Sequence, residues 1–297
     1  MKMHPDQIDV DAATVAEVVA AQQPQWSDRP IAAVTSHGTV NALFRLGDDI
    51  VLRFPLCPSA SDAAREELLG EQERARLVAP HVALAVPEPL ALGEPTAAYP
   101  GWWTAYRWIP GVTAGPDTIR ESSRFARDLA GFVRALDAVP TGGRTWDGVS
   151  RGGPLITRDD DVRESLARSR ALVDTERLAQ EWQRCLDAAP HAGPDRWIHA
   201  DLMPGNLIVR DGELVAVIDL GAVCVGDPAV DLMPAWNLLP RNAREVFREE
   251  LGVDDDAWLR GRGWAVVQAI VALPYYVRTN RVMADTARHT LAAILEE

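Results

Sequence analysis

The sequence predicts an α+β protein with two lobes, in which a β-rich N-terminal lobe precedes a mostly helical C-terminal lobe. Short apolar runs separated by glycine turns over residues 31–54 indicate antiparallel strands, whereas helical periodicity dominates from about residue 117 onward. The length of 297 residues suits two lobes that share a cleft. We therefore place the N-terminal lobe at 1–108 and the C-terminal lobe at 109–297.

The N-terminal lobe is expected to contain an antiparallel meander between two helices. A turn that includes His37 and Gly38 joins the first two strands, and a second turn begins at Gly47. Ser61 or Asp62 is a suitable N-cap for the second helix. The predicted elements are a helix over 12–22, strands over 31–35, 42–46 and 50–54, a helix over 61–78 and a strand over 102–109.

The C-terminal lobe is expected to be helical apart from one compact β unit. Helices are predicted over 117–139 and 160–188, with a glycine-rich loop at 141–153 between them. Residues 196–219 are predicted to form two strands around a polar loop, and the chain after Pro228 is predicted to be helical.

Composition excludes several classes of protein. Hydrophobic residues make up 47% of the chain, which excludes disorder, and the net charge of -13 excludes a general nucleic-acid surface. Lys2 is the only lysine, so the other 29 of the 30 basic residues are arginines. A mechanism that needs a buried lysine is therefore excluded.

The cysteines and the hydropathy pattern indicate a cytoplasmic protein. Cys57, Cys185 and Cys224 are far apart and form no CxxC pair, which is typical of reduced thiols rather than a disulfide framework or a zinc site. We identify no signal peptide, and no stretch approaches the roughly 20 apolar residues that span a membrane. We expect no nucleic-acid or membrane partner, and a monomer or a homodimer.

The strongest chemical signal lies between Trp197 and Gly221. A polar loop precedes a short apolar strand, a turn and a second apolar strand that ends just before Asp219. This hairpin is expected to bring Asp201, Asn206 and Asp219 to one end of two paired strands. Two carboxylates and a carboxamide suit a hard cation such as Mg²⁺, which prefers oxygen ligands and takes few of them from the protein.

This stretch resembles the catalytic and metal-binding loops of the aminoglycoside phosphotransferases, which are relatives of the protein kinases. The resemblance implies that Asp201 is the catalytic base and that Asn206 and Asp219 bind Mg²⁺. It also implies a structural role for Asp231, in the Gly-Asp-Pro-Ala-Val-Asp-Leu segment at 226–232, and His199 is expected to brace the loop. A protein-kinase-like bilobal fold is implied as well.

The resemblance places a nucleotide, ATP or GTP, in the N-terminal lobe. The turn region of the meander resembles the loop that covers the phosphates in this family, and its potential donors are Ser36, Gly38, Thr39 and Asn41. The resemblance also places a hinge between the lobes near 105–111, where backbone groups near Arg107 and Trp108 are expected to contact the base.

Arg53 occupies the place of the lysine that binds phosphate in the family. With no lysine available, it is the credible substitute, because a guanidinium can bridge phosphates. Its expected partner is Glu71 in the following helix, with Glu67 and Glu73 as alternatives.

The acceptor is expected to be a small molecule. Asp219 and Asp231 are separated by 231 − 219 = 12 positions, too few for a regulated peptide-docking loop. The resemblance puts an aminoglycoside-like antibiotic first, and hence a role in antibiotic resistance. A macrolide, a peptide antibiotic, an amino alcohol or a sugar remains an alternative, as does a non-catalytic nucleotide-binding pseudokinase. The candidate acceptor-binding residues are Glu245, Glu249, Asp254, Asp255, Trp236 and Trp264.

Overall fold

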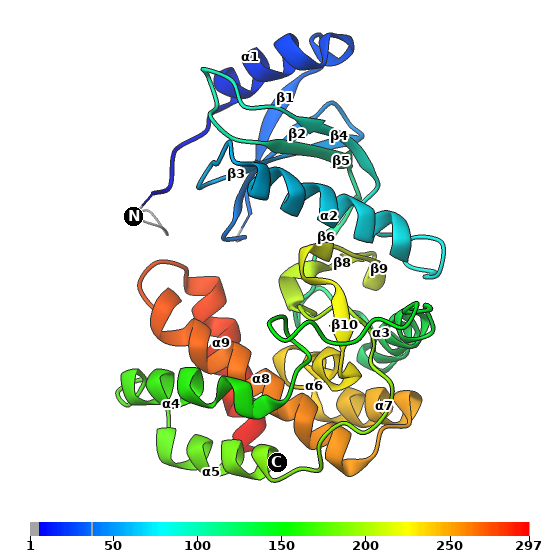
Figure 1. Ribbon diagram of the computed structural model, residues 1–297, viewed down its shortest axis with the longest axis vertical. Coiled ribbons are helices and arrows are strands. Elements are labelled where there is room, and N and C mark those ends of the chain that lie inside the picture. The colour runs from blue at the N-terminus through cyan, green and yellow to red at the C-terminus, as the bar shows by residue number, and fades with distance from the viewer. Residues whose placement is uncertain (1–5, 37, 297) are drawn as a thin grey trace. The chain divides into compact units, whose positions relative to one another are not determined.

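The structure is a computed structural model that describes residues 6–36 and 38–296 (Figure 1). The chain divides into two compact units. The N-terminal unit comprises the chain up to Pro80, Ala85–Pro110 and Ile218–Gly221, and the C-terminal unit comprises the remainder. A short piece that contains Asp219 therefore belongs to the N-terminal unit, although it follows the β-hairpin of the C-terminal unit.

The N-terminal unit is built on a five-stranded antiparallel sheet (Figure 1). The strand order is β1-β2-β3-β5-β4, so the predicted meander forms its first three strands. The strands are β1 (Ile31–Val34), β2 (Asn41–Leu46), β3 (Ile50–Pro55), β4 (Pro89–Gly93) and β5 (Trp103–Arg107).

Two helices flank these strands in the sequence, as predicted. Helix α1 (Ala12–Gln22) begins after Asp11, whose side chain accepts a hydrogen bond from the backbone N–H of Thr14. Helix α2 (Asp62–Val78) has Ser61 as its N-cap, with its Oγ accepting from the N–H of Ala64.

An aromatic cluster fills the core of the N-terminal unit. The rings of Phe54 and Trp103 stack with centroids 5.3 Å apart, and Tyr99 meets Phe54 edge-on at 4.9 Å. The Tyr99 hydroxyl donates to the carbonyl of Pro55 at 2.7 Å, so this buried polar group is satisfied. The cluster fixes β3, the strand that carries Arg53, against β5.

The C-terminal unit contains two small sheets. One has the order β6-β8-β9 and the other pairs β7 with β10. Asp211 and Gly212, with φ of 53° and 83°, make the tight turn between β8 and β9. These strands are β6 (Val112–Thr113), β7 (Arg196–Ile198), β8 (Leu207–Arg210), β9 (Glu213–Val217) and β10 (Cys224–Gly226).

Helices make up most of the C-terminal unit. Helix α8 packs against α4, α5 and α9, and α7 packs against α3 (Figure 1). The helices are α3 (Ser122–Asp137), α4 (Asp159–Arg168), α5 (Thr175–Leu186), α6 (Pro234–Asn237), α7 (Arg241–Leu251), α8 (Asp255–Tyr276) and α9 (Arg281–Leu295). Short 3-10 helices lie at Pro24–Trp26, Leu155–Arg158, Pro204–Asn206, Leu220–Ala222 and Pro228–Leu232.

Two predicted helices differ from those observed. The segment 160–188 forms two helices, because Asp174 accepts a hydrogen bond from the N–H of Arg177 and so starts a new helix at α5. Helix α3 begins at Ser122 rather than near residue 117, because Thr118 forms a local turn with the backbone of Gly115.

Across residues 6–36 and 38–296, every helix is too short or too polar to span a lipid bilayer.

A methyl group at Gly93 should destabilise the N-terminal unit. A Cβ there would lie 1.9 Å from the indole of Trp103, which is fully buried. We expect Gly93→Ala to lower the free energy of unfolding by about 1–3 kcal/mol, the usual cost of overpacking, as measured by urea denaturation. The control is Gly131→Ala in α3, where a Cβ meets nothing within 4 Å. Equal stability of the two variants would contradict this packing.

Candidate active site

The carboxylate of Asp201 is held by three side chains of the C-terminal unit. Its Oδ1 accepts a hydrogen bond from Gln268 Nε2 at 2.7 Å and forms an ion pair with Nη1 of Arg151. Its Oδ2 accepts from Asn206 Nδ2 at 3.1 Å. A carboxylate offers about four lone-pair positions, so these contacts fill Oδ1 and leave one position at Oδ2.

The backbone before Asp201 adopts a strained conformation that two neighbours hold in place. Ala200 has φ of 63°, in the left-handed region that non-glycine residues rarely adopt. Its N–H donates to Asp231 Oδ1 at 2.8 Å, and its carbonyl accepts from Arg151 Nη1 at 2.8 Å. The N–H of His199 donates to Asp231 Oδ2 at 2.7 Å.

His199 lies inside the C-terminal unit. It is fully buried, its ring packs edge-on against Phe132 with centroids 6.3 Å apart, and its Nδ1 accepts from the N–H of Asp201 at 3.3 Å. These contacts suit a residue that braces the loop, and its burial keeps the ring away from solvent.

Burial raises the pKa of Asp231 to about 7, although the hydrogen bonds from the N–H groups of His199 and Ala200 lower it. The carboxylates of Asp137 and Asp201 raise the pKa of Asp231 further. The loop therefore depends on the Asp231 carboxylate. Its two hydrogen bonds stabilise the ionised form, whereas burial and the neighbouring carboxylates destabilise it.

Asn206 is oriented to expose an oxygen. Its Nδ2 donates to the Asp201 carboxylate and, at 2.9 Å, to the Asp201 carbonyl, which leaves Oδ1 as a ligand oxygen. Leu207 pairs with Val217, so the chain before β8 and the chain after β9 leave the hairpin at the same end. An amide oxygen is a ligand of the kind that Mg²⁺ prefers, and Mg²⁺ takes few ligands from the protein.

No group of three or more His, Cys, Asp or Glu side chains among the described residues has the arrangement of a metal site. The predicted ligands Asn206 and Asp219 are one amide and one carboxylate, so they do not form such a group of three. The C-terminal unit holds Asn206 and the N-terminal unit holds Asp219, and their joint binding of Mg²⁺ stays a prediction.

Arg53 forms an ion pair with Glu71 in the N-terminal unit. Of the three glutamates considered from the sequence, Glu71 makes this contact, and it is only 6% exposed. Burial opposes the charge of Arg53, but the carboxylates of Glu71 and Asp219 outweigh it and raise the pKa of Arg53. Its guanidinium also lies over the Tyr106 ring, 5.4 Å from the centroid.

Arg74 of α2 fixes the segment that carries Asp219. Its Nε donates to the carbonyl of Leu220 at 3.0 Å and its Nη2 to that of Gly221 at 2.9 Å. A Cβ at Gly221 would lie 3.4 Å from Asp219 Oδ1, so glycine leaves room for this carboxylate. Sequence reasoning missed Arg74, although its position three residues after Glu71 places both on one helix face.

Arg151 and Gln268 were also missed, and no sequence signal identifies them. They contact Asp201 from a loop 50 residues earlier and from a helix 67 residues later. Only the tertiary structure reveals these contacts.

The predicted phosphate-covering residues lie around the exposed turn between β1 and β2. The N–H of Gly38 donates to Ser36 Oγ at 3.0 Å, and Asn41 begins β2 opposite Pro55. Thr39 lies between them, and His37 lies outside the described residues. Phosphate binding by this turn stays a prediction.

The backbone N–H groups of Arg107 and Trp108 form hydrogen bonds within the N-terminal unit. The N–H of Arg107 donates to the carbonyl of Glu88 at 2.9 Å, and the N–H of Trp108 donates to the carbonyl of Asp49 at 2.8 Å. Contact between a nucleotide base and backbone groups near these two residues stays a prediction. The exposed Arg107 side chain pairs with Glu88 and Asp49.

Two of the expected acceptor-binding residues belong to the core. Trp236 and Trp264 are 0% and 2% exposed, so neither offers surface to a ligand. Trp236 packs against Trp258 with ring centroids 4.7 Å apart. We therefore remove both tryptophans from the acceptor set.

The acidic candidates lie at the start of α8 and on α7. Asp254 caps α8 by accepting from the N–H of Ala257 at 2.7 Å, and Asp255 pairs with Arg248. Gln268 lies 268 − 255 = 13 residues after Asp255 in α8, which is about 20 Å along a helix axis. Glu245 and Glu249 are exposed on α7, which packs against α3.

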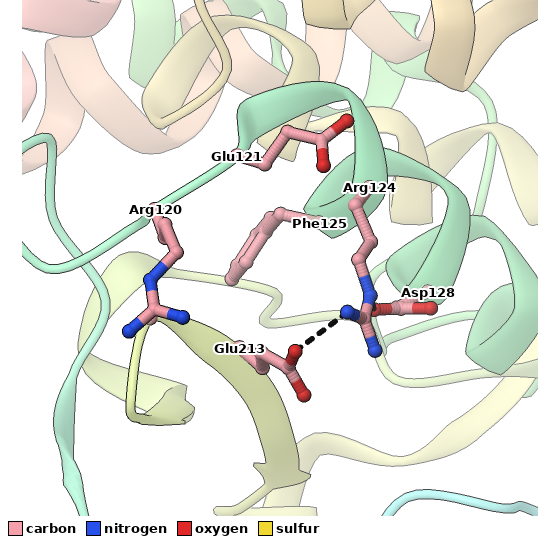
Figure 2. Close-up of a pocket in the computed structure, with 7 residues that line it drawn as sticks. Arg120, Glu121, Arg124, Phe125, Asp128 and Glu213 are labelled. Atoms are coloured by element: carbon pink, nitrogen blue, oxygen red, sulfur yellow. Dashed lines mark hydrogen bonds and ion pairs between the residues drawn. The ribbon is translucent and has the colours of Figure 1, made fainter.

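A surface hollow lies between the start of α3 and the β8–β9 turn (Figure 2). Arg124 reaches across it to Glu213 at 2.6 Å and also pairs with Asp128. None of the predicted site residues lines this hollow, so it is separate from the cluster around Asp201.

A family described as "Phosphotransferase enzyme family" matches residues 32–269, which is most of the chain. Two curated relatives are homoserine kinases. The one from Phenylobacterium zucineum is 27% identical over 133 residues, covering 44% of this chain and 39% of the relative. The one from Methylocella silvestris is 31% identical over 123 residues, covering 40% and 36%. The chain thus matches less than half of the length of either relative.

Several solved structures share the fold over almost the whole chain. The GDP complex of aminoglycoside 2'-phosphotransferase-IIIa has a TM-score of 0.70 at 18% identity, covering 97% of this chain and 99% of that one. A macrolide 2'-phosphotransferase from Brachybacterium faecium has a TM-score of 0.62 at 22% identity, covering 95% and 97%. These similarities confirm the predicted fold class, with a β-rich N-terminal region and a helical C-terminal region.

Stability should depend on pH through Asp137, at the end of α3. Burial raises the pKa of Asp137 to about 6, although Arg196 lowers it. Asp137 Oδ1 is buried with no hydrogen-bond partner among the described residues. A carboxyl whose pKa is raised on folding stabilises the protein below its unfolded pKa of 3.8, and this contribution is lost as the pH rises through about 6.

We therefore expect Asp137→Asn to gain stability over the wild type between pH 4 and pH 8, by up to about 3 kcal/mol. Urea denaturation across this range measures it. Asp128→Asn, at a more exposed carboxylate of the same helix, is the control, and its difference from wild type should change little with pH. A constant difference for Asp137→Asn would contradict the assignment.

Proposed function

Because this chain belongs to the phosphotransferase enzyme family, we propose that it transfers the γ-phosphate of ATP or GTP to a hydroxyl group of a small molecule. The observation that carries the proposal is the orientation of Asp201. Its Oδ1 is filled by two donors, its Oδ2 keeps one open position, and Asn206 presents an oxygen beside it.

Asp201 is the proposed general base. The acceptor hydroxyl donates to the open position of Oδ2 and gives up its proton there as its oxygen attacks the γ-phosphorus. The new oxygen–phosphorus bond forms while the bond from the γ-phosphorus to the bridging oxygen breaks, and the nucleoside diphosphate leaves with that electron pair. The two hydrogen bonds to the backbone of Ala200 fix the orientation of the Asp201 carboxylate during this step.

Arg53 is the proposed phosphate-binding cation. Its pair with Glu71 fixes the guanidinium, and its planar donors suit two phosphate oxygens at once. Asn206 and Asp219 would hold Mg²⁺, which when bound neutralises charge on the phosphates. The intact Arg53–Glu71 pair favours a working nucleotide site over a pseudokinase.

The acceptor is proposed to lie along the last three turns of α8. Gln268 contacts Asp201, and Val271 and Tyr275, three and seven residues later, share its face and are 41% and 48% exposed. This face is apolar. The acids expected to bind a polycation lie at the other end of α8 or on α7, and two of them have local partners.

An antibiotic remains the leading acceptor class, because solved structures of this fold include aminoglycoside and macrolide phosphotransferases. The apolar face beside Asp201 favours a macrolide-like body over a polycationic aminoglycoside. The homoserine kinases among the relatives support a small amino alcohol as a second candidate. The fold does not choose among acceptors, so turnover must decide.

The first test is Mg²⁺-dependent release of ADP or GDP with a panel of a macrolide, an aminoglycoside, a peptide antibiotic, choline and homoserine. We expect one acceptor to stimulate turnover, and Asp201→Asn to reduce the stimulated rate by about 10²–10⁴-fold, because the amide cannot take the proton.

The matched control is Asp211→Asn in the β8–β9 turn, where asparagine tolerates the positive φ of 53° and should leave turnover unchanged. Full activity of Asp201→Asn would sink the mechanism. Tight nucleotide binding with no turnover for any acceptor would instead favour the pseudokinase.

Arg53→Met should weaken binding of MgATP or MgGTP by about 10- to 100-fold, the usual loss for a charge-assisted hydrogen-bonded contact. Isothermal titration calorimetry measures the affinity. Arg65→Met, an exposed arginine of α2 over the Trp102 ring, is the control and should bind as the wild type does. Unaltered affinity of Arg53→Met would place the phosphates elsewhere.

A further inference from the structure

We infer that Arg151 has a second role beyond holding Asp201: it is the cation that contacts the phosphoryl group in transit. This inference rests on the proposed function, because it assumes that Asp201 is the base. It assigns a catalytic role to an arginine from the loop before Leu155, outside the segment that carries Asp201 and Asn206.

The backbone of this arginine is docked so closely that its position is defined. The carbonyl of Gly152 accepts from the N–H of Asp227 at 2.8 Å. A Cβ at Gly152 would lie 2.6 Å from Ile198 Cδ1, and a Cβ at Gly226 would lie 2.8 Å from the Gly152 carbonyl oxygen. Only glycines permit this close approach. The backbone next to Arg151 therefore packs directly on β7 and β10, which fixes its position.

The guanidinium uses one nitrogen for both of its contacts in the loop. Nη1 donates to the Ala200 carbonyl and to Asp201 Oδ1, while Nη2 and Nε form no hydrogen bond with any residue that the structure describes. The Arg151 side chain is 41% exposed, compared with 24% for Asp201. Arg151 therefore presents cationic donors to solvent directly beside the proposed base.

A cation is needed at this position, and the loop itself supplies none. Residues 199–206 include no lysine or arginine, and the single lysine of the chain is Lys2. Negative charge on the phosphoryl oxygens must be stabilised during transfer, and an arginine held in the same chain can do this. Arg151 is the arginine that contacts Asp201 among the described residues.

Arg151 can contact Asp201 and the phosphoryl group at the same time, through different nitrogens. Nη1 of Arg151 holds the Ala200 carbonyl and Asp201 Oδ1, and the solvent-facing Nη2 and Nε are the donors for the oxygens of the phosphoryl group while it passes from the nucleotide to the acceptor oxygen. No further reactant is required, since the arginine keeps its charge throughout.

The test compares binding of MgADP or MgGDP alone with binding of the same nucleotide plus aluminium fluoride, which imitates the phosphoryl group in transit. Calorimetry on the full chain measures both. We expect the wild type to gain at least about 10-fold in affinity from the fluoride. Arg151→Met should lose most of that gain and keep the affinity for the diphosphate alone within about 3-fold.

Two further variants separate charge from support of the loop. Arg151→Lys keeps the charge and should retain more of the fluoride gain than Arg151→Met. Arg144→Met removes an exposed arginine of the same loop, which lies over the Trp197 ring, and should keep the whole gain. Thermal melting verifies that each variant is folded.

The outcomes distinguish a failure of the proposed function from a failure of the role inferred for Arg151. If the wild type binds neither diphosphate, the proposed function fails and this inference fails with it. If it binds a diphosphate but Arg151→Met retains the fluoride gain, or if Arg151→Lys and Arg151→Met lose it equally, the role of Arg151 is confined to holding Asp201 and the inference alone is overturned.

Discussion

The site depends on one buried carboxylate, that of Asp231. It accepts the N–H groups of His199 and Ala200, and it is the partner that allows Ala200 to keep a left-handed backbone. Without these bonds the two amides would be buried and unpaired, and Ala200 would relax toward the right-handed or extended regions. Since Asp201 follows Ala200 directly, its direction depends on a residue that lies 30 positions later (231 − 201).

In both units, arginine side chains hold the loops that carry the candidate site residues. Arg151 donates from one nitrogen to a carbonyl and a carboxylate. Arg74 donates from two nitrogens to the carbonyls of two successive residues. A planar guanidinium with five donors can serve several fixed acceptors at once, which a lysine ammonium on a flexible stem does less well. A chain with a single lysine thus keeps its acidic loops in place, and Arg53 with Glu71 follows the same pattern.

The sequence was informative where spacing along the chain determines structure. The meander and the β8–β9 hairpin follow from local periodicity and turn residues, and the pairing of Glu71 with Arg53 follows from the family resemblance. It was uninformative where contacts join distant segments. Arg151 and Gln268 carry no motif, and the burial of Trp236 and Trp264 depends on how the helices of the C-terminal unit pack. Periodicity identifies a helix face as apolar but does not say which face is covered.

In the proposed function, helix α8 connects the choice of acceptor to the base. Its first turn is acidic and tied to Arg248, whereas its last turns present Gln268 to Asp201 and leave Tyr275 exposed. A ligand that packs on this exposed face presses on the same helix that positions Oδ1 of the carboxylate. Binding energy from a part of the acceptor that does not react can therefore fix the base in its productive orientation. Under the proposed function, α8 is therefore the element that would distinguish acceptors of different chemistry.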